Sequence, residues 1–241
     1  MSLTRLDKIL ADAGLATRSE ARRMIAHGRV TVDGAAITAP DAKFDPGASD
    51  IRLDGTPACT RKFRYFMMNK PEGVVSATGD AEQRTVLDLL PKELQRLGLF
   101  PVGRLDKDTT GLIILTNDGA LCHEATSPKH HVDKVYEFTV DGMLDEADVA
   151  AFAGGIVLQD GTVCRPAALV PDPADPARGT VVLSEGKYHQ VKRMLASRGA
   201  HVHTLKRAAI GGLALDATLV PGAFRELTPE EVVLLYDKVT I

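Results

Sequence analysis

The sequence predicts an α+β fold with a small N-terminal module and a larger C-terminal domain. Within the first 35 residues, two amphipathic helical patterns precede a strand pattern and a turn. From residue 65 onward, short apolar or alternating runs are separated by turn residues, which is typical of strands. Residues 39–62, rich in Pro, Gly, Asp and Thr, lie between the two parts. A chain of 241 residues is long enough for two unequal domains, each with its own core.

The N-terminal module begins with two predicted helices. Apolar residues follow Thr4 at helical spacing, so we expect Thr4 to cap the first helix and Gly14 to end it. Thr17-x-x-Glu20 is a capping-box pattern at the start of the second helix. The arginines of this helix lie away from its apolar stripe: Arg18 and Arg22 on one face, with Arg23 nearby.

A hairpin is expected to complete the module. Residues 29–32 have a strand pattern, and Asp33-Gly34 is a strong hairpin-turn signal. Residues 51–53 form a further expected strand, followed by a turn. We place the domain boundary after this turn, which gives an N-terminal domain at 1–60 and a C-terminal domain at 61–241.

The C-terminal domain is expected to combine short strands with a few helices. Lys70 lies in the turn after the first strand, and we do not assign it to phosphate binding. The expected strands are 65–68, 112–115, 134–140, a strand–turn–strand unit at 157–170, and 181–183. The expected helices are 85–90, 120–126, 145–153, one around Lys192, and one after Thr228.

The segment from Pro101 to Gly119 is the strongest candidate for a functional site. The apolar, β-branched run 112–115 predicts a buried strand, and the glycines around it predict turns. Asp106 and Asp108 lie in the loop before this strand, where a rigid scaffold commonly positions catalytic groups. By spacing alone, carboxylates in such loops are more often solvated turn residues or helix caps than catalytic groups.

Composition excludes several classes of protein. No apolar stretch approaches the roughly 18 residues needed to cross a bilayer, and the charged N-terminus lacks the apolar region of a signal peptide. Three widely spaced cysteines, at positions 59, 122 and 164, fit a reducing cytoplasm better than a disulfide framework. The net charge is −3, but residues 184–207 contain six basic residues and a single acid. Such a stretch can form a phosphate-binding face, although by charge alone a solvated charged face explains it better.

Metal and nucleotide sites are not expected. His130-His131 and His201-x-His203 each lack a third ligand at suitable spacing. The sequence also contains no P-loop and no Rossmann glycine pattern.

Four segments resemble one family in the same order along the chain. GRLD at 103–106, followed by DTTGL at 108–112, resembles the catalytic motif of the pseudouridine synthases. KVYEF at 134–138 and SEGKYHQVKRM at 184–194 are similar to the branch that modifies small-subunit ribosomal RNA. RLDKILADAGLATRSEARRMIAHGRVTVDG, residues 5–34, resembles the S4 RNA-binding module. The resemblance implies a mainly antiparallel mixed sheet in the C-terminal domain.

The resemblance also implies an activity and a set of partners. The expected reaction converts one uridine of bacterial 16S ribosomal RNA, uridine 516, to pseudouridine without a cofactor or metal. The expected partner is 16S RNA or a small-subunit assembly intermediate, and we expect a monomer. One alternative is a related synthase acting on 23S RNA. A second is a non-catalytic S4-type binding or assembly protein, which would have no need for Asp106.

The roles of individual residues follow from the same resemblance. Asp106 is the expected nucleophile or base, and Tyr136 stacks on the target base. Lys192 keeps Asp106 ionised through a single contact; its helix places it at the edge of an apolar stripe. Arg104 fills the space that the base vacates. The expected RNA-binding residues are Arg104, Arg18, Arg22, Arg23, Lys187, His189 and Arg193.

Overall fold

The computed structural model describes residues 3–58, 63–127, 130–237 and 239, and the chain divides into two compact units. The first unit comprises Met1–Arg64 and Leu90–Leu99; the second comprises Tyr65–Leu89 and Phe100–Ile241. The boundary expected at residue 60 and the cysteine at position 59 lie outside the described residues.

The first unit packs two helices against a four-stranded antiparallel sheet of order β3-β2-β5-β6. Its core is formed by the apolar stripes of both helices and the inward side chains of β2 and β5, including Leu10, Ile25 and Val30. The elements are β1 (Thr4–Arg5), α1 (Leu6–Asp12), α2 (Arg18–Ala26), β2 (Val30–Val32), β3 (Ala35–Ile37), β4 (Lys43–Phe44), β5 (Ile51–Leu53) and β6 (Thr56–Pro57). α3 (Lys92–Gln95) groups with this unit.

The predicted capping box is confirmed, whereas the cap predicted for the first helix is wrong. Thr17 Oγ1 accepts a hydrogen bond from the Glu20 amide at 3.2 Å, and the Glu20 carboxylate accepts one from the Thr17 amide at 2.7 Å. Thr4 instead lies in β1, which pairs with β4. The chain is therefore extended at Thr4, and α1 begins at Leu6 without a side-chain cap.

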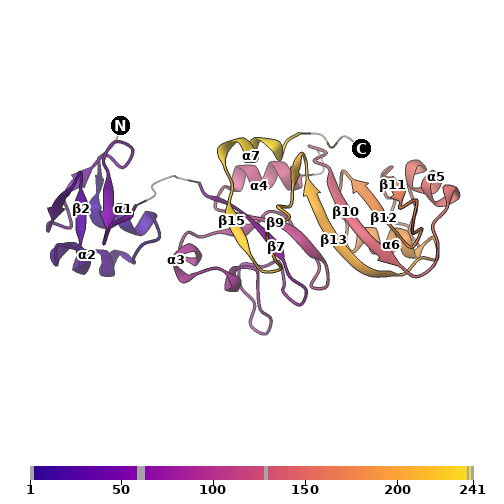
Figure 1. The fold of residues 1–241 in the computed structure, drawn as a ribbon, viewed down its shortest axis with the longest axis horizontal. Helices are drawn as coiled ribbons and strands as arrows, with labels where there is room; N and C mark the ends of the chain where they lie inside the picture. Colours follow the sequence, from indigo (N-terminus) through magenta and orange to yellow (C-terminus); the bar gives the residue numbers. More distant parts are fainter. Residues whose placement is uncertain (1–2, 59–62, 128–129, 238, 240–241) are drawn as a thin grey trace. The chain divides into compact units, whose positions relative to one another are not determined.

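The second unit is built on a nine-stranded sheet (Figure 1). Its main order is β11-β12-β10-β13-β9-β7-β15, with β14 paired to β13 and β8 paired to β9. β9 and β13 run parallel, and the other strand pairs are antiparallel, which confirms the expected mainly antiparallel sheet. The strands are β7 (Tyr65–Lys70), β8 (Phe100–Pro101), β9 (Thr110–Thr116), β10 (Lys134–Val140), β11 (Ala168–Pro171), β12 (Arg178–Leu183), β13 (Val202–Ile210), β14 (Leu213–Ala214) and β15 (Phe224–Glu226).

Helices cover this sheet and bury its apolar strands. α4 and α7 lie beside one another over β7 and β9 in Figure 1. Leu121 of α4 and Leu235, just after α7, share a core cluster with Leu112 and Ile114 of β9. The helices of the unit are η1 (Leu87–Leu89), α4 (Gly119–Thr126), α5 (Glu146–Gly154), α6 (Gln190–Ala196) and α7 (Pro229–Leu234). No helix in the described ranges is both long and apolar enough to span a membrane.

Two expected elements differ from the structure. Residues 157–170 do not form two paired strands: Val157 and Val163 make one isolated bridge, and a regular strand begins only at Ala168. Both valines are about two-thirds exposed, so no core holds them in an extended ladder. The helix expected at 85–90 is a single 3-10 turn, Leu87–Leu89.

Candidate active site

The loop between β8 and β9 carries Asp106 and is held in place by hydrogen bonds and by a buried side chain. Ser76 Oγ donates to the Leu105 carbonyl and accepts from the Leu105 amide, both at 3.0 Å. The Leu105 side chain is buried, and the Thr109 amide donates to the Asp106 carbonyl. Asp106 therefore sits on a constrained backbone while its carboxylate remains about one-third exposed.

Lys70 is a further anchor of this loop. Its side chain is fully buried, and Nζ donates to the carbonyl oxygens of Thr109 (2.7 Å), Pro71 (3.1 Å) and Lys107 (3.2 Å). Burial lowers the pKa of Lys70 to about 8, although the nearby Asp108 and Asp106 oppose this shift. Lys70 thus ties the end of β7 to the loop that carries Asp106.

Two side chains from the region of α6 face Asp106. Lys192 Nζ lies 3.3 Å from Asp106 Oδ2, and His189 Nε2 lies 3.4 Å from Asp106 Oδ1. His189 precedes α6 in a left-handed backbone conformation with φ 48°. The ring of Tyr188, which is exposed, stacks on that of His189 at 3.9 Å. His189, one of the residues expected to bind RNA, therefore also lies next to Asp106, the expected catalytic carboxylate.

Lys192 makes the single contact expected with Asp106, and it also pairs with Asp108. Its Nζ is 2.5 Å from Asp108 Oδ1, closer than to Asp106. The hydrogen bond from Lys192 lowers the pKa of Asp108 below its ordinary value, although burial acts in the opposite direction. The helix pattern itself is confirmed, since Val191, Met194 and Leu195 are buried. Lys192 lies at the edge of that stripe and can reach the loop.

A cavity of about 600 Å³ opens beside Asp106, within the second unit. Tyr136 and Arg104 line it, together with Lys187 and His189. Tyr136 is 9% exposed and belongs to the buried face of β10. A smaller cavity shares Asp106, Tyr136 and Arg104 and reaches Leu205 of β13. The structure thus brings Asp106, Tyr136 and Arg104 to one hollow, with Lys192 on the far side of the carboxylate.

Lys134 and Arg207 also line this cavity, and sequence reasoning assigned neither. Arg207 pairs in register with Tyr136 across β10 and β13, and Lys134 lies two residues before Tyr136. The alternating pattern of 134–140 placed Lys134 on the same strand face as Tyr136, which was the signal that could have identified it. Arg207 was counted only as one charge of a basic stretch.

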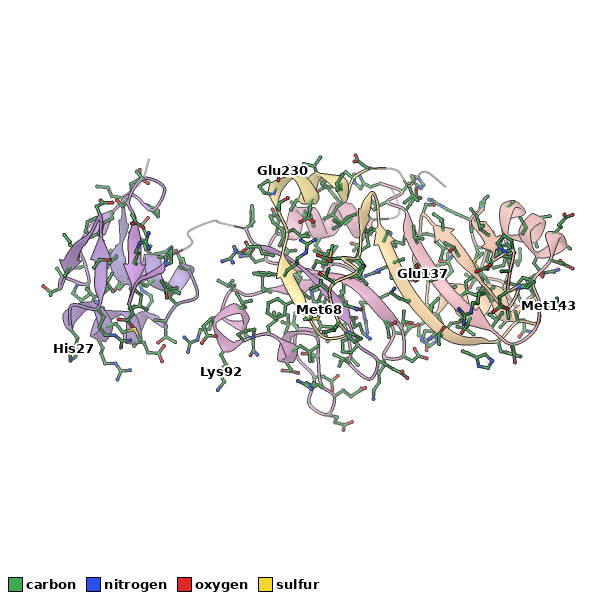
Figure 2. All side chains as sticks on the ribbon, viewed as in Figure 1. His27, Met68, Lys92, Glu137, Met143 and Glu230 are labelled. Atoms are coloured by element: carbon green, nitrogen blue, oxygen red, sulfur yellow. The ribbon has the colours of Figure 1, made fainter. Side chains whose placement is uncertain are left out.

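The basic stretch at 184–207 is largely neutralised by neighbouring acids. Apart from Arg207, which is buried, each of its lysines and arginines forms an ion pair, and most partners lie outside the stretch. Glu137, one such partner, is labelled on β10 in Figure 2. Beyond Lys192, the pairs are Lys187–Glu185 (2.6 Å), Arg193–Asp160 (2.5 Å), Arg198–Asp148 (2.7 Å) and Lys206–Glu137 (3.2 Å).

The arginines of α2 differ from one another in the first unit. Arg22 and Arg18 pair with Asp7 at 3.1 and 3.5 Å. Asp7 is 1% exposed; burial would raise its pKa, but Arg5 and Arg18 hold it below the ordinary value. Arg23 is exposed, and no ion pair engages it within the part of the chain that the structure describes.

Among the described residues, no group of three His, Cys, Asp or Glu could hold a metal ion.

Known proteins match this chain along most of its length. The RNA pseudouridylate synthase family matches residues 64–197, and the S4 domain family matches residues 4–49. The chain is 42% identical to ribosomal small subunit pseudouridine synthase A of Escherichia coli K12 over 95% of this chain and 98% of that protein. It is also 42% identical to the RNA pseudouridine synthase YtzG of Bacillus subtilis, described as uncharacterized, over 97% of this chain and 98% of that protein.

A solved structure agrees with these matches. A crystal structure of a pseudouridylate synthase superposes with a TM-score of 0.68 at 36% identity, covering 96% of this chain and 99% of the other. This likeness spans both units, and the family match includes the loop of Asp106, Tyr136 of β10 and Lys192 of α6. The chain belongs to the RNA pseudouridine synthases, in the group that carries an N-terminal S4 domain.

Proposed function

We propose that this enzyme converts a single uridine of bacterial 16S ribosomal RNA, uridine 516, to pseudouridine. The observation that carries the proposal is the carboxylate of Asp106, which is exposed to a cavity, next to a cation and on an anchored loop. The similarity to a small-subunit synthase along 95% of the chain supports 16S RNA as substrate. The partner is 16S RNA or a small-subunit assembly intermediate, bound by a monomer.

The reaction breaks the bond between N1 of uracil and C1′ of ribose, rotates the base and joins C5 to C1′. Asp106 either attacks C1′ as nucleophile or removes the C2′ proton as base. Lys192, 3.3 Å away, favours its ionised form. Tyr136 stacks on the extruded base, and Arg104 fills the space left in the RNA. Extrusion costs a few kcal/mol, which contacts to the RNA must offset.

The RNA-binding residues are divided between the two parts of the chain. In the S4 domain, proposed to span residues 1–60, Arg18, Arg22 and Arg23 face the RNA backbone. In the synthase domain, proposed to span residues 61–241, Lys187 and His189 line the cavity, and Arg193 lies on α6 close to His189. Lys187 and Arg193 already pair with acids, so RNA phosphates must compete for them. The Arg193–Asp160 pair is partly exposed and worth about 0–1 kcal/mol, so phosphate can replace Asp160 at little cost. Glu185 is buried, so releasing Lys187 from it costs more.

The test maps pseudouridines in 16S and 23S RNA from cells that lack this protein, by primer extension after carbodiimide treatment. We expect one 16S position to lose its modification. Wild type should restore it and Asp106→Asn should not, although the variant keeps RNA affinity within about threefold, because the amide preserves shape but not nucleophilicity. Normal turnover by Asp106→Asn would refute the role of this residue.

Two other outcomes would redirect the proposal. Loss of a 23S modification would mean that the protein is a pseudouridine synthase whose substrate is the RNA of the large subunit. No change in either RNA, with purified wild type also inactive on 16S transcripts, would favour a binding or assembly role. In that case Asp106→Asn should match wild type in every assay.

A further inference from the structure

The inner wall of the cavity presents two cations beside Tyr136. Arg207 is the register partner of Tyr136 on β13, and Lys134 lies two residues away on β10. Cross-strand neighbours have Cβ atoms about 4.5–5.5 Å apart, and residues i and i+2 share a face. Lys134 and Arg207 therefore flank the side chain proposed to stack on the target base, and both line the cavity.

Arg207 retains hydrogen-bonding capacity that the described protein does not use. It is 2% exposed, and its Nε donates to the Leu112 carbonyl at 2.8 Å. Its Nη2 is buried and has no hydrogen-bond partner among the described residues. A buried charged donor that lacks a hydrogen-bond partner destabilises the protein, so such a group is expected to have a function.

Lys134 has similar spare capacity. Its Nζ donates to the Val132 carbonyl at 2.7 Å. An ammonium group has three donors, so further donors remain for a ligand. Burial, with a smaller contribution from the charge of Arg207, lowers the pKa of Lys134 to about 8, and Asp133 opposes both effects.

The surroundings of these cations suit a base better than a phosphate. Ile210 is the register partner of Lys134 and lines the cavity with Val102 and Ala125. These three residues belong to one apolar core cluster. A flat ring with apolar faces and two carbonyl oxygens matches a wall that combines apolar side chains with cationic donors. A phosphodiester would leave its charge beside an apolar surface.

We propose that Lys134 and Arg207 bind the carbonyl oxygens of the extruded uracil and stabilise the negative charge that the ring acquires when it leaves C1′. This inference rests on the proposed function. When the N1–C1′ bond breaks, its electron pair stays with N1 and spreads onto O2 and O4. C1′ gains either a bond to Asp106 or a double bond to C2′, whose proton has moved to Asp106.

The ring uses the same electron pair to form the C5–C1′ bond. In the first case the bond from C1′ to Asp106 breaks and releases the carboxylate; in the second the C1′=C2′ double bond is lost as C2′ takes its proton back from Asp106. C5 then loses its proton and N1 gains one. Lys134 and Arg207 keep their protons throughout and act by electrostatics alone. Fixed donors aimed at developing charge in a water-poor site commonly contribute 10²–10³-fold to a rate. The two cations serve either role of Asp106, because the leaving ring is anionic in both.

The test compares full-length variants in single-turnover conversion of a 16S transcript and, separately, in RNA affinity. Lys134→Met should slow conversion by at least about 30-fold and change Kd less than about threefold. The matched control is Arg178→Met, which removes an exposed cation that pairs with Asp175 and does not line the cavity. It should match wild type in both assays.

The pH profile gives a second readout. The rate of wild type should fall as pH rises through about 8, because Lys134 loses its charge there. Lys134→Arg stays charged and should show a clearly smaller fall. Lys70, whose pKa burial also lowers to about 8, is present in both proteins and does not cause the difference. Other charged groups facing the cavity are common to both proteins and cancel in the comparison: Arg207, Asp133, Arg104, Asp106, Lys107, Lys187 and His189.

Distinct results would overturn the inference. If Lys134→Met converts RNA as fast as wild type, or loses rate only in proportion to affinity, Lys134 does not stabilise the leaving ring. If Lys134→Arg keeps the alkaline fall in full, another group causes it. Arg207→Lys, which retains the charge but removes Nη2, should also slow conversion. If wild type itself is inactive on the 16S transcript, the proposed function is refuted. If wild type is active and Asp106→Asn is inactive, the proposed function holds, and any of the results above refutes only the role of Lys134 and Arg207.

Discussion

At the scale of single residues, Lys192 lies between two carboxylates to which we assign different tasks. It is 2.5 Å from Asp108 and 3.3 Å from Asp106. Asp108 is nearly two-thirds exposed, whereas Asp106 borders the cavity. We infer that Asp108 positions the ammonium group of Lys192, and that the positive charge of this group keeps Asp106 ionised.

Substitutions at both ends of this contact separate the two tasks. Lys192→Met should slow single-turnover conversion about 100-fold, since it removes the cation beside Asp106. Asp108→Asn should stay within about threefold of wild type, because Lys192 can then pair with Asp106 alone. If Asp108→Asn is as inactive as Asp106→Asn, Asp108 takes part in the chemistry.

The sequence predicted this site unevenly. Asp106, Tyr136 and Lys192 were found because they lie in contiguous strings with a family resemblance, and the structure brings them together. The role of Asp106, Tyr136 and Lys192 remains a prediction. Arg207 escaped notice because a charge count treats every arginine as exposed. Its burial depends on β9 and β10, which pair with β13 from distant parts of the sequence.

At the scale of elements, the parallel contact between β9 and β13 joins the two halves of the site. β9 follows the loop of Asp106, and β13 carries Arg207; Gly111 and Arg207 are register partners. Gly111 has φ 98°, and a Cβ there would lie 2.3 Å from the Arg207 carbonyl oxygen. This close approach requires glycine at position 111.

Gly111→Ala should therefore destabilise the second unit by about 3 kcal/mol or more, because both the backbone angle and the strand contact oppose a side chain. The matched control is Gly73→Ala, which also has positive φ, 81°, but no atom within 4 Å of its added Cβ. Its cost should be about 1–2 kcal/mol. Thermal unfolding measures both, and equal shifts in Tm would show that the strand contact is unimportant.

The elements themselves were more predictable than their pairing. Local signals identified the capping box at Thr17, the turn at Asp33-Gly34 and the buried strand β9. Thr4 failed because its pairing with β4, nearly 40 residues away, overrides a weak capping signal. The strand expected from residue 157 failed for the opposite reason: an alternating pattern without a partner face does not form a ladder.

At the scale of the whole molecule, the modest net charge of −3 conceals cations that differ in availability. Most basic side chains of residues 184–207 are paired with acids. On α2, Arg22 is tied to the buried Asp7, whereas Arg23 is exposed. A cation that contacts RNA phosphates releases counterions condensed on the RNA. An unpaired cation does so without first breaking an ion pair within the protein. We expect Arg23 to contribute more to RNA affinity than its paired neighbours.

Arg23→Ala should weaken binding of a 16S transcript about three- to tenfold at low salt and reduce the slope of log K against log salt by about 1. Its Tm should not change. Arg22→Ala is the matched comparison. It removes one of the cations that pair with Asp7, whose side chain is 1% exposed, and a buried carboxylate with fewer partners destabilises the fold, so the Tm of this variant should fall. The chemical step, measured with enzyme in saturating excess, should be normal in Arg23→Ala, because Asp106 and its cavity lie in the other unit. An unchanged salt slope in Arg23→Ala would mean that this face of α2 does not contact the RNA backbone.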